Sequence, residues 1–104
     1  MTLDDRVEIP PQVMSRTVAD EVVVLDLAAG TYFGLDPVGA RIWQLMAEGQ
    51  TLRDISEQML AEYEVARDEL ERDVLRLAAE LHDQQLIRIL AVAPPDDRVD
   101  TRPR

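Results

Sequence analysis

The pattern of apolar and polar positions changes once along the chain and divides it into a strand region and a helical region. From about residue 12 to 35 the two kinds of residue alternate, which predicts β-strands because successive strand side chains point to opposite faces. Residues 21–27 form the strongest candidate, since they are rich in β-branched residues. Residues 12–18 and 31–35 are the other two. Gly30 can supply the positive φ of a tight hairpin, so we expect an antiparallel meander.

The helical region begins at an Asp-Pro pair, where the apolar period becomes 3.6. Asp36 can cap the first helix, and Pro37 fits its first turn. Gly49 is a typical residue just beyond a helix end. Thr51 begins the second helix in a capping box, with Asp54 in place of the usual Glu or Gln.

The third helix is predicted over residues 67–83, and a short extended piece over residues 86–90 follows it. Its start is weakly capped because Ala66 has no side-chain oxygen. One stripe within about 60° forms the predicted core face: Leu70, Val74, Leu77 and Leu81. A neighbouring stripe is half apolar: Glu71, Leu75, Ala78 and His82. Periodicity does not decide whether that second stripe is the margin of a wide core face or one wall of a groove.

Composition separates the two ends from the middle of the chain. Residues 1–11 are mostly polar and end in two prolines, which predicts a flexible N-terminal arm. Residues 12–92 are expected to form one α+β domain, with a three-stranded antiparallel β-meander followed by a three-helix bundle. Residues 93–104 hold too few large apolar side chains to order themselves, so we expect a disordered C-terminal tail.

The charge and the cysteine content exclude several classes of function. The net charge is −10 and all 11 basic residues are arginine, so general electrostatics oppose binding to a phosphate backbone. The chain has no cysteine, which excludes disulfides and thiolate metal sites. No apolar run approaches the roughly 20 residues that span a membrane. With no signal peptide apparent, the expected location is cytoplasmic.

No set of residues indicates catalysis or a cofactor. His82 is the only histidine, so it has neither a cysteine partner nor a second histidine to share a metal. The carboxylates are spread along the helices in the manner of a solvated face, and the glycines are too scattered for a phosphate loop. We therefore predict a protein that is not an enzyme and that uses no cofactor or metal.

The third strand is an exposed edge in a meander of three strands. It carries no charge and no proline, although proteins normally block such edges. Phe33 and Leu35 are expected to face the core, whereas Tyr32 points to the other side. An open edge beside a half-apolar helix suits the addition of a strand from another polypeptide. Pairing of this edge with a second copy, which would make a homodimer, stays open.

Residues 24–27, 30–36 and 38–45 resemble the PqqD-like proteins, and the likeness extends over roughly residues 12–90. The resemblance implies a winged helix-turn-helix-like domain that recognises leader peptides of ribosomally made, post-translationally modified natural products. In that family the leader lies as an extra strand against the third strand, in a cleft walled by the third helix. A separate maturation enzyme then acts, such as a leader peptidase in lasso-peptide pathways or a radical SAM enzyme.

The resemblance also assigns a binding site by position. The strand side of the cleft comprises Thr31, Tyr32, Phe33, Gly34 and Leu35. The helix side comprises Val74, Leu75, Ala78 and His82, with Arg67 and Glu71 at the rim. A winged-helix DNA-binding regulator is the alternative, but acidic residues outnumber arginines on the third helix.

Overall fold

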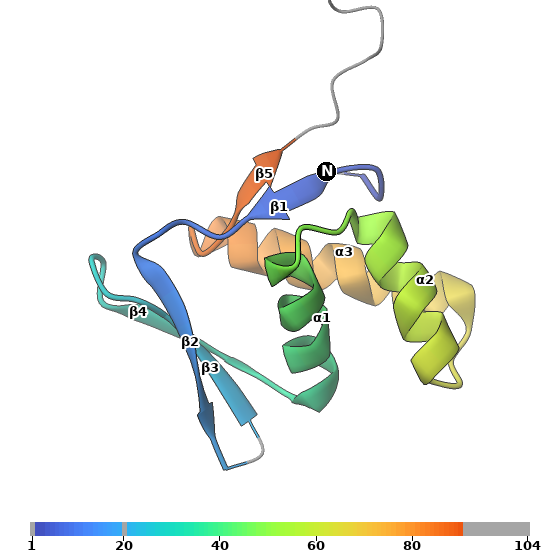
Figure 1. Ribbon diagram of the computed structural model, residues 1–104, viewed down its shortest axis with the longest axis horizontal. Coiled ribbons are helices and arrows are strands. Elements are labelled where there is room, and N and C mark those ends of the chain that lie inside the picture. The colour runs from blue at the N-terminus through green and yellow to red at the C-terminus, as the bar shows by residue number, and fades with distance from the viewer. Residues whose placement is uncertain (1, 20, 91–104) are drawn as a thin grey trace, which may run out of the picture.

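The computed structural model describes residues 2–19 and 21–90 as an α+β fold of strands followed by helices (Figure 1). The elements follow in the order β1 (Arg6–Glu8), β2 (Val13–Val18), β3 (Glu21–Asp26), β4 (Thr31–Leu35), α1 (Pro37–Ala47), α2 (Leu52–Glu62), α3 (Arg67–Asp83) and β5 (Arg88–Leu90). The predicted winged helix-turn-helix-like arrangement, a three-stranded meander followed by three helices, is confirmed. The predicted tail at residues 93–104 lies outside the described residues. No helix in the described ranges is long and apolar enough to cross a bilayer.

The main sheet has the strand order β2-β3-β4, and both pairings are antiparallel. Val24 at its centre is fully buried and pairs with Phe33 on β4. The turn between β3 and β4 depends on two residues. Gly30 adopts a φ of +75°, as predicted, and the Asp26 carboxylate accepts hydrogen bonds from two turn amides over 2.9 and 3.0 Å.

The helix starts follow the predicted capping chemistry. Asp36 Oδ1 accepts a hydrogen bond from the backbone N–H of Gly39 over 2.7 Å, and Pro37 occupies the first turn of α1. Thr51 Oγ1 accepts from the N–H of Asp54 over 3.1 Å at the start of α2. Ala66 gives α3 no side-chain cap, as expected.

The predicted flexible arm is wrong for part of residues 1–11. Arg6–Glu8 forms β1, which pairs with β5 above the helices and aligns Val7 with Ile89 (Figure 1). Val7 is only 3% exposed and belongs to the core. The prediction failed because a three-residue strand has no readable period, and its partner lies about eighty residues further along the chain.

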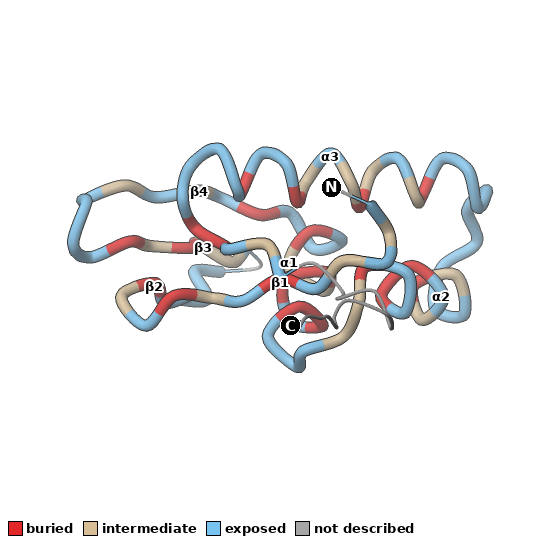
Figure 2. Tube along the Cα trace, turned by 90° about the horizontal axis from the view of Figure 1, so that it is seen from above, coloured by how far each residue is buried: buried red, intermediate tan, exposed pale blue. Residues whose placement is uncertain are grey.

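The hydrophobic core lies among the three helices and extends to the inner face of the main sheet. Its fully buried members come from β3, all three helices and the segment between α3 and β5: Val24, Leu45, Leu52, Ile55, Met59, Val74, Ala78, Leu81 and Leu86. Figure 2 shows α3 running along one side of the molecule next to β4, with β2 on the opposite side. The fold thereby brings the outer sheet edge and the third helix together.

Candidate functional site

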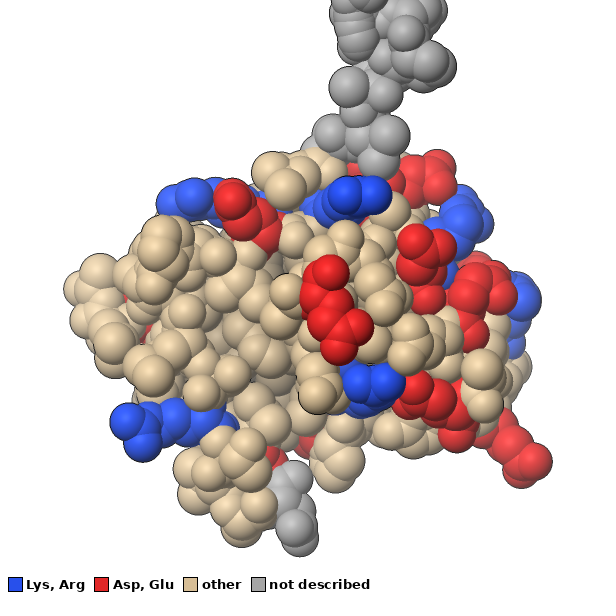
Figure 3. Space-filling model, viewed as in Figure 1, with Lys and Arg blue, Asp and Glu red and all other residues tan. Residues whose placement is uncertain are grey.

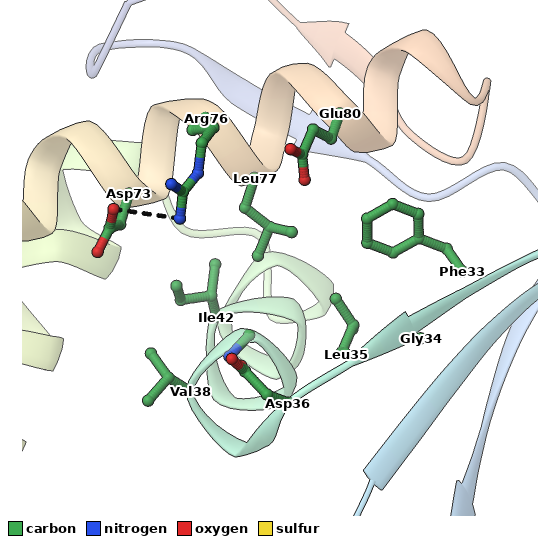
Figure 4. Close-up of a pocket in the computed structure, with 11 residues that line it drawn as sticks. Phe33, Gly34, Leu35, Asp36, Val38, Ile42, Asp73, Arg76, Leu77 and Glu80 are labelled. Atoms are coloured by element: carbon green, nitrogen blue, oxygen red, sulfur yellow. Dashed lines mark hydrogen bonds and ion pairs between the residues drawn. The ribbon is translucent and has the colours of Figure 1, made fainter.

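An open cleft of about 360 Å³ lies between β4, the first turns of α1 and the middle of α3 (Figure 4). Its lining combines apolar side chains with charged ones: Phe33, Gly34, Leu35, Asp36, Val38, Gly39, Ile42, Asp73, Arg76, Leu77 and Glu80. The volume falls within the range of about 300–1,000 Å³ that is usual for ligand sites.

The strand side of the cleft is the edge of the main sheet. Within the described ranges β4 pairs only with β3, so its second edge keeps its backbone groups unpaired. Leu35 is buried and Phe33 half-buried, whereas Tyr32 is 73% exposed. This alternation confirms the predicted faces of the strand. A Cβ on Gly34 would meet no atom within 4 Å, so the outer side of β4 is open at that position.

The helix side of the cleft is one flank of α3. Leu77 lies between Arg76 and Glu80 and points toward Ile42 of α1 and Leu35 at the end of β4 (Figure 4). The Arg76 guanidinium forms an ion pair with Asp73 over 3.2 Å, one turn apart. With Asp36, the lining holds three carboxylates against one guanidinium. The cleft therefore has an apolar floor, and carboxylates outnumber the guanidinium among its charged residues.

The predicted helix residues do not line this cleft. Val74 and Ala78 are fully buried in the core, where a bound chain cannot reach them. Leu77, which was expected in the core, is half-buried and takes the place in the cleft that was predicted for Leu75. Leu75 is also half-buried, on the opposite flank of the same core stripe. At about 100° per residue, the two flanks differ by more than a third of a turn, so the predicted wall lies on the other side of α3 from this cleft.

The predicted rim residues, Arg67 and Glu71, and the predicted His82 lie outside this cleft. Arg67 forms ion pairs with Glu57 on α2 and with Glu71, and these carboxylates raise the pKa of the Arg67 guanidinium. His82 lies near the C-terminal end of α3, in a separate hollow that it shares with Asp26. None of these side chains lies beside β4 in the cleft.

The predicted strand residues divide into two groups. Phe33, Gly34 and Leu35 line the cleft, whereas Thr31 and Tyr32 do not. The Thr31 Oγ1 atom is buried and has no hydrogen-bond partner among residues 2–19 and 21–90.

Sequence reasoning missed the charged residues of the α3 flank: Asp73, Arg76 and Glu80. Their charges made them look like a solvated surface, and nothing in the local sequence marks them as the wall of a cleft. Across the described ranges, no group of three or more potential ligands is placed to hold a metal ion. The arrangement suits the binding of an extended polypeptide along β4.

Comparison with known proteins identifies the group to which this fold and cleft belong. Two solved structures are similar to the chain. One, "TbiB1 in Complex with the TbiA(beta) Leader Peptide", is 44% identical with a TM-score of 0.72, over 77% of this chain and 93% of that chain. The other, "Lasso peptide synthetase B1 complexed with the leader peptide", is 27% identical with a TM-score of 0.73, over 79% and 96% of the two chains. None of the curated proteins matches.

The family described as "Coenzyme PQQ synthesis protein D (PqqD)" matches residues 21–87. That match begins with β3 and ends just before β5, so it includes β4, α1 and α3, the three elements that form the cleft. It covers well over half of the chain, and the chain therefore belongs to the PqqD family.

Proposed function

We propose that this protein binds the leader segment of a ribosomally synthesised precursor peptide as an added β-strand on β4. The peptide lies in the cleft between β4 and α3 and is presented to a separate maturation enzyme. The observation that carries the proposal is the unpaired edge of β4 next to a cleft with an apolar floor. Strand addition uses backbone hydrogen bonds for affinity and side-chain pockets for selectivity.

The similar structures support this proposal. Both are described as complexes with a leader peptide, and nearly the whole of each of those chains matches this one. At 44% identity, TbiB1 is close enough for leader-peptide binding to be a direct expectation for this chain. One of the two descriptions names a lasso peptide synthetase, so a leader peptidase of a lasso pathway is our first candidate for the partner enzyme, ahead of a radical SAM enzyme.

The surface charge opposes the alternative of a DNA-binding regulator. In the cleft, Asp73 and Glu80 flank Arg76, and Arg76 is already paired with Asp73. The face in Figure 3 carries acidic and basic side chains side by side over its helical half and shows no continuous basic surface. A DNA reader needs clustered positive charge for phosphate contacts.

A titration with the leader half of a precursor peptide encoded beside this gene tests the proposal. We expect binding in the micromolar range or tighter, and no shift of a DNA duplex in a gel assay. The absence of binding by the folded protein to any neighbouring precursor would contradict the proposal.

The mode of binding is tested by methylating the leader backbone at one nitrogen at a time. In an added strand only alternate N–H groups point toward β4, so affinity should fall at every second position of the paired segment. Each affected position should lose about tenfold or more, since about 1.4 kcal/mol corresponds to tenfold. A uniform effect, or none, would contradict strand addition even if the peptide binds.

A further inference from the structure

A small apolar hollow adjoins the far end of the cleft. It has a volume of about 140 Å³ and lies where the start of α1, the end of α2 and the start of α3 meet. Its lining is mainly apolar, with two carboxylates: Val38, Met59, Tyr63, Val65, Glu69, Leu70 and Asp73. We call this hollow the α2–α3 socket. It is well below the roughly 300 Å³ of a small-molecule site, and its size suits a single side chain.

The socket is open to solvent although its walls are apolar. Met59 and Leu70 form a floor that is 0% and 4% exposed. Around it, Val38, Tyr63 and Val65 are 40%, 36% and 45% exposed, three of the large apolar side chains that the described residues leave in water. When a further apolar group covers exposed apolar side chains such as these, apolar surface leaves water and the free energy of the system falls.

The socket adjoins the cleft, because Val38 and Asp73 line both. Figure 4 shows Phe33 at one end of the cleft, with Val38 and Asp73 at the other. Strand pairing on β4 ends at Leu35, where the chain turns into α1. A peptide that continues beyond that point along the cleft passes over Val38 and Asp73 and reaches the socket.

From this adjacency we infer that the socket holds one apolar side chain of the same leader peptide, at a position just outside the segment that pairs with β4. The inference rests on the proposed function and adds a second, distinct contact to it. Backbone pairing alone carries little sequence information, whereas one side chain in a dedicated socket selects among peptides. The selected class is an extended leader with a medium-sized apolar residue beside its paired segment.

The test compares two substitutions of exposed valines by glutamate. Val65→Glu places a charge on the socket wall, whereas Val18→Glu, at a position 58% exposed on β2, is the control. We expect Val65→Glu to weaken binding of the neighbouring leader at least tenfold, and Val18→Glu to change it less than twofold. Equal affinities of Val65→Glu and the wild-type protein would overturn the inference.

An alanine scan of the leader then identifies the side chain in the socket. One apolar leader position, outside the positions sensitive to N-methylation, should lose affinity with the wild-type protein and lose little more with Val65→Glu. Additive losses at every apolar position would contradict occupancy of the socket. Methyl NMR of the wild-type protein gives an independent readout, because leader binding should shift Met59 and Val65, and the alanine variant at that position should not.

These outcomes separate the inference from the proposed function. If the wild-type protein binds no leader, the proposed function fails and the inference fails with it. If Leu77→Ala in the cleft weakens binding while Val65→Glu does not, only the inference fails.

Discussion

The backbone N–H of Gly39 donates to the Oδ1 atom of Asp36 over 2.7 Å, and this bond lies where β4 becomes α1. A Cβ on residue 39 would lie 3.2 Å from that oxygen and 3.3 Å from Cδ2 of the buried Leu35. Both distances are shorter than nine in ten contacts that real Cβ atoms make, so glycine lets the helix start directly against the strand without displacing these neighbours. Leu35 and Gly39 both line the cleft at this junction.

We predict that Asp36→Ala lowers the free energy of unfolding by about 1 kcal/mol, the usual cost of losing an N-cap. Asp36→Asn is the control, since its side-chain oxygen can accept the same hydrogen bond and should retain most of the stability. Urea unfolding monitored by circular dichroism measures both. An equal loss in the two variants would mean that the carboxylate charge, and not the cap hydrogen bond, stabilises the start of α1.

The two flanks of α3 show how far the sequence can be interpreted without the fold. Its apolar stripe predicts which face is buried, and Leu70, Val74 and Leu81 are buried as expected. Periodicity placed Leu77 in the core stripe and Leu75 beside it, whereas in the structure both are half-buried and border the buried stripe on either side. Only the path of the chain from β4 through α1 brings Leu77 to the open strand edge.

The matched pair Leu75→Ala and Leu77→Ala tests that assignment. Both side chains are half-buried, so each substitution should cost about 1–2 kcal/mol of stability, less than the 2–5 kcal/mol of a fully buried leucine. Leu77→Ala should weaken leader binding about tenfold, because it removes apolar surface from the cleft, while Leu75→Ala should leave affinity within about twofold. A titration in which Leu75→Ala has the larger effect would restore the flank expected from the sequence.

Local sequence signals predicted the helices and the strands of the main sheet. They did not predict the pairing of β1 with β5, which depends on residues far apart in the sequence. Alternation, β-branched residues, Gly30 and the caps at Asp36 and Thr51 are all contained within a few neighbouring residues, and the structure has the strands and helices where these signals place them. The pairing of β1 with β5 joins two short segments at opposite ends of the described chain. Residues 86–90 were expected to be extended, but the three residues of β1 carry no pattern that marks them as a strand or as the partner of β5.

The role of β1 in the core leads to a second matched pair, Val7→Ala and Val18→Ala. Val7 is 3% exposed and Val18 is 58% exposed, and each substitution removes the same atoms. We expect Val7→Ala to cost about 2 kcal/mol of unfolding free energy, and Val18→Ala about 0.5 kcal/mol or less. Urea unfolding decides the matter: a small effect of Val7→Ala would mean that residues 1–11 behave in solution as the flexible arm expected from their composition.

An ion pair joins α1 to α2 and predicts that the stability of the fold depends on pH. Arg41 donates from Nε and Nη2 to the two carboxylate oxygens of Glu62, over 3.0 and 2.8 Å. The hydrogen bond from Arg41, helped by one from Gln58, lowers the pKa of the Glu62 carboxyl below its ordinary value of 4.5. Since the folded-state pKa is lowered, the contribution to stability is present above the unfolded-state pKa and is lost as pH falls through the folded-state pKa.

We therefore expect Glu62→Gln to lower the Tm at pH 7, and the difference from the wild-type protein to narrow as the pH falls below 4.5. Glu64→Gln removes the same charge from an exposed acid nearby, and it controls for the relief of repulsion in a chain of net charge −10. Thermal unfolding of the three proteins across this pH range measures the effect. Equal Tm values for the two variants at pH 7 would show that the bidentate pair adds no stability, because exposed ion pairs can contribute nothing measurable.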